Sequence, residues 1–186
     1  MSLSLVAKKL RLPLGFILAA LYLWLAPRYV TRQTLLIGGV IALLGLLVRA
    51  WASGHIMKND RLATSGPYAF TRNPLYFGSF LISVGFALAA HWYFLVGVVA
   101  FFALIYGPTM AREKANISGR FPDAYPDFER NVPAFFPRPL PWRGGGAAGD
   151  GTGFSFPLYM KHGEWKAALG YLGAVAYLAF WVIRKS

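Results

Sequence analysis

The sequence predicts an all-α integral membrane protein with about five transmembrane helices. Of its 186 residues, 56% are apolar and only 14% are charged, a balance that excludes a disordered or ordinary soluble chain. The charged residues also avoid four apolar runs, and the run 73–111 is about twice the ~20 residues needed to cross a bilayer core. A run of that length has to turn back on itself, so the four runs give five crossings.

Each helix is placed by an uncharged run and by the residues at its ends. The long run is divided at Ala89-Ala90-His91-Trp92, which predicts a tight helical hairpin. The runs of the second and fifth helices lie at or below the short end of the usual range for a crossing, and Arg49, Arg184 and Lys185 are expected to reach from their ends toward the headgroups. The five helices are expected near residues 12–30, 35–52, 75–90, 92–110 and 167–183.

The distribution of positive charge predicts the orientation of the chain. Five crossings place the N-terminus and the segments 52–73 and 112–166 on one side of the membrane, with fourteen Lys and Arg residues against four on the other side. Basic residues close to membrane helices are retained in the cytoplasm. We therefore expect residues 1–186 to form one multi-pass domain of the inner (plasma) membrane, with its active site facing the cytoplasm.

The net charge of +12 raises the question of nucleic-acid binding. Within 112–166, eight basic residues face six acidic ones, and this small excess predicts no nucleic-acid partner. The absence of cysteine and the presence of only three histidines predict no metal site.

A glycine-rich segment, residues 143–153, contains a formal G-x-G-x-x-G pattern from Gly144 to Gly149. A dinucleotide site of this kind needs a strand before the glycines and a helix after them, whereas prolines precede this run and further glycines follow it. The segment is interpreted as a flexible linker to the fifth helix.

The polar segment 54–76 is the first candidate for chemistry. Gly66-Pro67 predicts a turn, and Pro74 fits the first turn of a helix. Arg72, together with the backbone N–H groups at that helix start, favours a carboxylate or phosphate ligand. Tyr68 and Tyr76 offer ring faces to a cation.

The same residues also have an interfacial explanation. Tyr68 and Tyr76 fit an aromatic belt, Arg72 fits a lipid phosphate, and Asn73 fits a helix cap. His55 alone is more often a hydrogen-bonded interfacial residue than a catalyst. Single-residue chemistry leaves both interpretations open.

The second candidate is the segment 112–137. Glu113 suits a cationic or amino-bearing ligand, although its neighbours Arg112 and Lys114 could instead neutralise it as a surface cluster. The hairpin brings Tyr76 and Glu113 to the same side of the membrane, so they are expected to meet across one pocket. Phe121, Tyr125 and Phe128 have helical spacing and favour a short interfacial helix over a ligand box.

Taken together, these segments resemble a known superfamily. The run R-L-A-T-S-G-P-Y-A-F-T-R-N-P-L-Y-F-G-S spans Arg61 to Ser79, with G-H-I before it and E-K-x-x-I-x-x-x-F-P-x-x-Y-x-x-F-x-x-x-V-P after it. This pattern is similar to the isoprenylcysteine carboxyl methyltransferase and phospholipid methyltransferase superfamily, whose members are integral-membrane enzymes that use S-adenosylmethionine. The resemblance covers about residues 54–137.

The resemblance implies a cofactor site and a reaction. It implies a methyltransferase that transfers a methyl group from S-adenosylmethionine to a lipophilic acceptor, such as an isoprenylcysteine-like carboxylate, a lipid amine or a thiol. Glu113 suits the amine of the cofactor, Arg72 suits its carboxylate, and His55 or Glu113 would serve as the base for an ammonium acceptor. The implied cofactor-binding residues are Asp60, Arg61, Leu62, Ala63, Gly66, Tyr68, Arg72, Asn73, Pro74, Tyr76 and Glu113.

The sequence departs from the superfamily pattern at three positions. Asn73 stands where the prenylcysteine enzymes usually carry histidine, Lys114 replaces a second glutamate, and Thr109 occupies a position where a substrate-contacting arginine is expected. These departures argue against a prenylcysteine acceptor and leave methyl transfer itself untouched.

Two other functions are compatible with a small polytopic chain. A membrane reductase of the sterol type would bind NADPH and would need a site for additional phosphates, for which the sequence offers only scattered arginines. A non-enzymatic scaffold would use the polar segments only to dock on lipid or on a partner.

Overall fold

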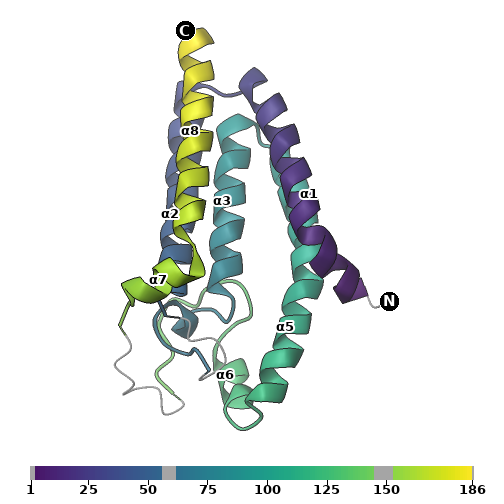
Figure 1. Ribbon diagram of the computed structural model, residues 1–186, viewed down its shortest axis with the longest axis vertical. Helices are drawn as coiled ribbons and strands as arrows, with labels where there is room; N and C mark the ends of the chain where they lie inside the picture. The colour runs from purple at the N-terminus through teal and green to yellow at the C-terminus, as the bar shows by residue number, and fades with distance from the viewer. Residues whose placement is uncertain (1–2, 56–61, 145–152, 186) are drawn as a thin grey trace.

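The computed structural model describes residues 3–55, 62–144 and 153–185, and all regular structure in these ranges is helical, with no strand. Figure 1 shows the long helices side by side, with the short helices α6 and α7 at one end. The elements are α1 (Leu3–Leu25), η1 (Ala26–Arg28), α2 (Arg32–Ser53), η2 (Gly66–Ala69), α3 (Pro74–Ala90), α4 (Phe94–Phe101), η3 (Phe102–Tyr106), α5 (Gly107–Arg120), α6 (Tyr125–Asn131), α7 (Phe156–His162) and α8 (Trp165–Lys185).

Within the described ranges, three helices are long and apolar enough to cross a membrane, namely α2, the continuous helix Phe94–Arg120 and α8. Two shorter apolar helices, Leu12–Arg28 and Pro74–Ala90, accompany them. The chain is therefore a multi-pass membrane protein. The prediction that the second and fifth helices are short was wrong, because α2 and α8 include polar residues at their ends that an uncharged run leaves out.

Two helix boundaries differ from those expected. The first helix begins at Leu3 rather than near residue 12, and the fourth continues to Arg120 rather than ending near residue 110. Charge ends a membrane-compatible run but does not end a helix, since Lys, Arg and Glu are good helix formers. The start of the second candidate segment, from Arg112, is consequently helical.

The fourth helix passes through a wider turn before Pro108. Residues Phe102–Tyr106 form a π-helical turn, in which the Gly107 N–H donates to the Phe102 carbonyl. A proline inside a helix removes one backbone donor and crowds the carbonyl four residues earlier. The π turn accommodates Pro108 and allows the helix to continue to Arg120.

The pair α2 and α3 packs backbone to backbone through glycines. A Cβ atom on Gly38 would lie 2.3 Å from the Gly85 carbonyl oxygen, and one on Gly45 would lie 2.5 Å from that of Gly78. Gly38 and Gly45 are seven residues apart on α2, and Gly78 and Gly85 are seven apart on α3. Each helix therefore presents its two glycines on one face. Small residues allow this close approach between helices in a membrane.

The two candidate segments lie at the same end of the bundle, as the hairpin predicted. In Figure 1, η2, α6 and the lower end of α5 meet there, while the α3–α4 hairpin lies at the opposite end. Helix α7 was not expected, since only a linker was placed before the fifth helix. Most of the predicted linker, residues 145–152, lies outside the described residues.

Candidate functional site

Residues 69–73 and 133–142 are tied together by hydrogen bonds. The Arg72 N–H donates to the Pro133 carbonyl at 2.9 Å, and the Trp142 N–H donates to the Ala69 carbonyl at 2.9 Å. The Asn73 amide also donates to the Ala134 carbonyl at 2.8 Å, which replaces the helix-cap role considered for it. Two parts of the chain about sixty residues apart therefore form one body.

A cavity of about 550 Å³ lies between this body and α5. Its volume is in the range of small-molecule and cofactor sites. One face of α5 contributes Gly107, Met110, Lys114, Ile117 and Arg120. The opposite wall includes five residues predicted from the sequence: Leu62, Ala63, Tyr68, Arg72 and Asn73.

Aromatic side chains form the floor of the cavity. Tyr125 and Phe128 are buried, and with Val132 they form a small core against which Phe121 and Trp142 pack. This confirms the expected short helix. The same rings also line the cavity, so packing and ligand contact are not alternatives at this position.

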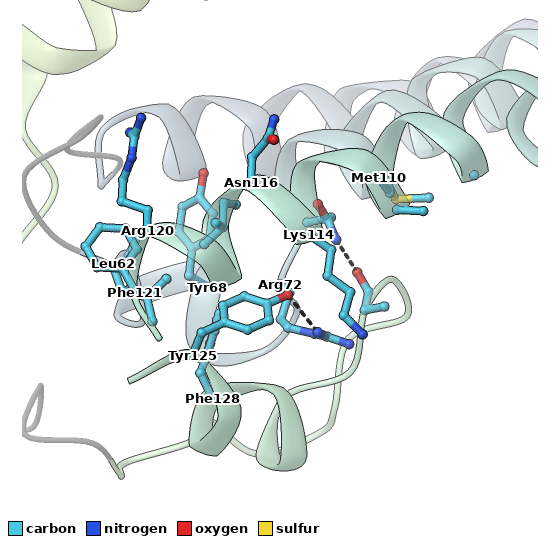
Figure 2. A pocket seen from close by; sticks show the side chains of 16 residues that line it. Leu62, Tyr68, Arg72, Met110, Lys114, Asn116, Arg120, Phe121, Tyr125 and Phe128 are labelled. Atoms are coloured by element: carbon cyan, nitrogen blue, oxygen red, sulfur yellow. Dashed lines mark hydrogen bonds between the residues drawn. The ribbon is translucent and has the colours of Figure 1, made fainter. Parts of the chain in front are cut away.

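Arg72 lies at the centre of the polar wall (Figure 2). Its Nη1 donates to the Tyr125 hydroxyl at 2.9 Å and to Glu129 Oε1 at 2.7 Å. Its Nε is buried and has no hydrogen-bond partner in the structure. A buried donor without a partner is costly, and on the wall of a cavity it suits an anionic ligand group.

Tyr68 has a second buried polar group without a partner. The residue is 6% exposed, its hydroxyl has no hydrogen-bond partner, and Figure 2 shows the hydroxyl pointing away from Arg72. Burial raises the pKa of this hydroxyl above its usual range, and the nearby carboxylates Glu113 and Glu164 raise it further. The hydroxyl is therefore neutral and able to bond a ligand or water.

The structure brings Tyr76 and Glu113 together, as the hairpin predicted, although neither side chain lines the polar cavity. The Tyr76 hydroxyl donates to Glu113 Oε1 at 2.7 Å, which joins the first turn of α3 to the face of α5 next to the cavity. The Tyr106 ring meets the Tyr76 ring edge-on, with the centroids 5.2 Å apart.

Other predicted residues lie away from the cavity wall. His55 Nδ1 lies 2.9 Å from the Trp51 carbonyl, to which the ring can only donate, so His55 bonds the last turn of α2. Gly66 has φ +57° and a Cβ there would meet the His55 ring, which explains the glycine at the predicted turn. Pro74 is buried at the start of α3. Asp60 and Arg61 lie outside the described residues.

Sequence reasoning missed Glu129, Met110, Asn116 and Arg120. Glu129 binds both Arg72 and Lys114, and the two cations hold the pKa of its carboxyl below the usual range, with Lys114 the larger cause. The other three lie on α5. The signal for Met110 and Arg120 was helical periodicity, which could have been followed past residue 110 if the helix had been continued through its charges, whereas Asn116 lies outside that periodicity.

A second cavity, of about 490 Å³, lies among the apolar helices. Its walls are almost entirely apolar and come from α1, α3, α4, η3 and α8, including Leu18, Phe86 and Phe101. Tyr106 lines this cavity, while the next residue, Gly107, lines the first. The linings of the polar and the apolar cavity therefore adjoin where the π turn ends and α5 begins.

The fold and cavities define a multi-pass membrane protein with a ligand-sized site at one end of its helical bundle. Residues 24–122, more than half of the chain, match the phospholipid methyltransferase family. The chain belongs to this family.

Two curated relatives are bacterial resistance proteins. The cobalt-zinc-cadmium resistance protein CzcN of Cupriavidus metallidurans is 34% identical over 124 residues, which cover 65% of this chain and 55% of the relative. The nickel-cobalt-cadmium resistance protein NccN of Alcaligenes xylosoxydans xylosoxydans is 32% identical over 113 residues, which cover 59% and 53%. The chain thus spans about half the length of these relatives. No solved structure is significantly similar to it.

Proposed function

We propose that the protein is an integral-membrane methyltransferase that uses S-adenosylmethionine to methylate a lipophilic acceptor. The observation that carries this proposal is the cavity enclosed by two segments remote in the sequence, with a partnerless arginine Nε in its wall. Membership of the phospholipid methyltransferase family supports the same reaction class.

Residues of the polar cavity fit the groups of this cofactor, together with Tyr76 and the Glu113 that it bonds, which lie outside the lining. S-adenosylmethionine, when bound, supplies an electrophilic methyl group on a positively charged sulfur. Arg72 Nε suits the carboxylate and Glu113 suits the amine. The rings of Tyr125 and Phe128 offer apolar faces to the adenine, and Tyr68 and Tyr76 suit the sulfonium side.

We further propose that the apolar cavity holds the hydrocarbon chain of the acceptor. Its walls are those of a site for a lipid chain, and it lies against the polar cavity across Tyr106 and Tyr76. A reacting group at this boundary would be held in line with the donor and away from water, so that positioning and desolvation supply most of the acceleration. Acceptors that arrive as carboxylate or thiolate need no base. An ammonium acceptor needs one, and Glu113 is nearer to the boundary than His55, whose ring bonds α2.

Five crossings with the N-terminus in the cytoplasm complete the proposal. The two shorter apolar helices lie alongside the three long ones (Figure 1), and the polar cavity then opens at the inner face, where the soluble cofactor is available.

The NADPH-dependent reductase is less well supported by the polar cavity. Arg72 Nε takes no part in the pair with Glu129 and suits a single anionic group. Lys114 is bound to Glu129 and is a poor partner for an additional phosphate, because the pair has to be broken first.

Calorimetric titration of the purified protein in detergent tests the proposed cofactor. We expect S-adenosylhomocysteine, the demethylated product, to bind and NADPH not to bind. Binding of NADPH without a response to S-adenosylhomocysteine would favour the reductase, and binding of neither would favour a scaffold.

Labelled S-adenosylmethionine identifies the acceptor. The protein is incubated with fractionated bacterial lipids, with prenylcysteine analogues and with small thiols in parallel. We expect label in a lipid-soluble product, whereas label confined to a small water-soluble thiol would contradict the lipophilic acceptor.

A further inference from the structure

An ion pair outside the polar cavity ties the last helix to the site. Arg49, near the C-terminal end of α2, donates through Nε to Glu164 Oε2 at 2.9 Å and through Nη2 to Glu164 Oε1 at 2.7 Å. The side chains are 23% and 14% exposed. Glu164 lies in the turn before α8 and beyond the residues that match the family.

The local backbone places Glu164 for this contact. Gly163 ends α7 in the left-handed conformation with φ +70°, which favours glycine and turns the chain toward α8. His162 Nδ1 lies 2.9 Å from the Ser53 carbonyl and holds the same turn against the end of α2. Glu164 follows directly and reaches Arg49.

The third nitrogen of Arg49 acts on α3 rather than on Glu164. Nη1 donates to the Ser79 hydroxyl and, at 3.4 Å, to the Leu75 carbonyl. The stem of Arg49 crosses α3 at Gly78, where a Cβ atom would lie 2.7 Å from Arg49 Cγ. Glu164 therefore holds the guanidinium in the orientation in which it bonds the first turns of α3.

These turns carry Tyr76, which bonds Glu113 beside the cavity. Glu164 and Glu113 also both act on the buried hydroxyl of Tyr68. The ion pair is thus linked, through the first turns of α3, to the bond between Tyr76 and Glu113.

Resting on the proposed function, we propose that Glu164 is a positioning residue of the cofactor site, acting through Arg49 on the first turns of α3. Helix α8, which follows Glu164 directly, then helps to position the cofactor site and does not only face lipid. An arginine in a membrane helix needs a partner in any case, so the test has to separate positioning from charge neutralisation.

The test compares the full-length variants Glu164→Gln, Arg49→Ala and the double variant, with Lys166→Gln as control. Lys166 is an exposed residue of α8, two positions from Glu164. The affinity for S-adenosylhomocysteine is measured by calorimetry well below the unfolding temperature, and amide hydrogen exchange is measured at residues 75–79 without ligand. We expect each single variant to weaken binding at least about fivefold and to speed exchange, the double variant to be no worse than Arg49→Ala, and the control to change neither.

The charge-swapped variant Arg49→Glu with Glu164→Arg separates the two roles. It keeps an ion pair between α2 and the turn before α8, but a glutamate at position 49 cannot donate to Leu75 or Ser79. We expect the swap to restore the unfolding temperature relative to the single variants but not the affinity. Restored affinity, or unchanged affinity in the single variants, would overturn the proposal.

Failure of the proposed function gives a different result. If the wild type does not bind S-adenosylhomocysteine, the methyltransferase proposal fails. Hydrogen exchange at residues 75–79 then decides by itself whether Glu164 holds the first turns of α3. Faster exchange in Glu164→Gln would then support the positioning of α3, and unchanged exchange would overturn it.

Discussion

The bond between Tyr76 and Glu113 joins the two arms of the helical hairpin at the end that carries the cavity. We expect Glu113→Ala and Tyr76→Ala each to weaken the binding of S-adenosylhomocysteine at least tenfold, about 1.4 kcal/mol. The reason is that Glu113 loses its orientation without Tyr76, and the proposed amine site is lost without Glu113. Calorimetric titration measures the affinity, and the unfolding temperature shows whether each variant is folded.

The matched control for this pair is Asp123→Ala. Asp123 is an exposed carboxylate between α5 and α6, away from the cavity lining. It should bind like the wild type. Wild-type affinity in both Glu113→Ala and Tyr76→Ala would remove the site assignment.

Glu129 predicts a pH dependence of the contact between α6 and α5. Lys114 and Arg72 hold the pKa of its carboxyl below the usual range, so the unfolded state binds more protons than the folded state as the pH falls through that range. The stabilisation is therefore complete above the usual glutamate pKa of about 4.3 and is lost as the pH falls through the lowered folded value. At a pH below the lowered pKa of Glu129, hydrogen exchange of residues 125–131 should be about threefold faster than at neutral pH, after correction for intrinsic rates. The effect is small because the ion pairs of Glu129 are partly exposed.

Glu129→Gln supplies the comparison for this effect. Glutamine does not titrate, so α6 in this variant should exchange faster at neutral pH and show little further acceleration in acid. Equal acid sensitivity of the two proteins would show that another group controls α6.

Arg72 and Glu129 illustrate what the sequence could reveal about the site. Arg72 stands in a dense local pattern beside Pro74 and Tyr76, so it could be identified without coordinates. Glu129 lies about sixty residues away among other charges, and its two partners, Arg72 and Lys114, come from different elements. Only the fold brings the three together.

The glycine contact between α2 and α3 carries the main prediction for a whole element. A Cβ atom on Gly85 would lie 2.4 Å from the Ala42 backbone nitrogen, and a backbone contact cannot move aside as a side chain can. We expect Gly85→Ala to lower the free energy of unfolding by about 1–3 kcal/mol, the cost of overpacking a well-packed contact. Unfolding in detergent measures it.

Gly173→Ala is the control for helix propensity. A Cβ at Gly173, in α8, has nothing within 4 Å, and alanine favours a helix over glycine by about 1 kcal/mol. Gly173→Ala should therefore be neutral or stabilising. A neutral Gly85→Ala would mean that α2 and α3 are not held at this distance.

The ends of the helices show why element boundaries were only partly predictable. The hairpin turn at His91 follows from the length of the apolar run and its single local break, and α3 ends at Ala90 as expected. The helix that follows continues past Arg112 because helix formation depends on backbone propensity, whereas the apolar run reports only compatibility with lipid. Helix α7 had no comparable signal, since seven residues after a glycine-rich segment carry little periodicity.

At the scale of the whole molecule, the length of the helix Phe94–Arg120 fixes where the site lies relative to the membrane. Its 27 residues span about 40 Å, whereas the hydrocarbon core is about 30 Å thick. The charged end of α5 therefore extends beyond the hydrocarbon core, and Glu113 lies close to the edge of that core, next to the polar cavity. The distribution of charge in the sequence predicted that the site lies at this end of the bundle. The cavity itself could not be predicted, because it depends on the hydrogen bonds between residues 69–73 and 133–142.

The absence of cysteine from the natural sequence allows a direct test of the orientation. Single cysteines replace Asp123, beyond α5, and Trp92, an exposed residue in the α3–α4 hairpin at the opposite end. In sealed vesicles with the cytoplasmic face inside, an impermeant maleimide should label Trp92→Cys at once, but Asp123→Cys only after the membrane is opened, because the basic residues gather at the Asp123 end. The unaltered chain gives the background. Labelling in the reverse order would place the cavity outside the cytoplasm, and labelling of both sites from one face would contradict the helical hairpin as a pair of crossings.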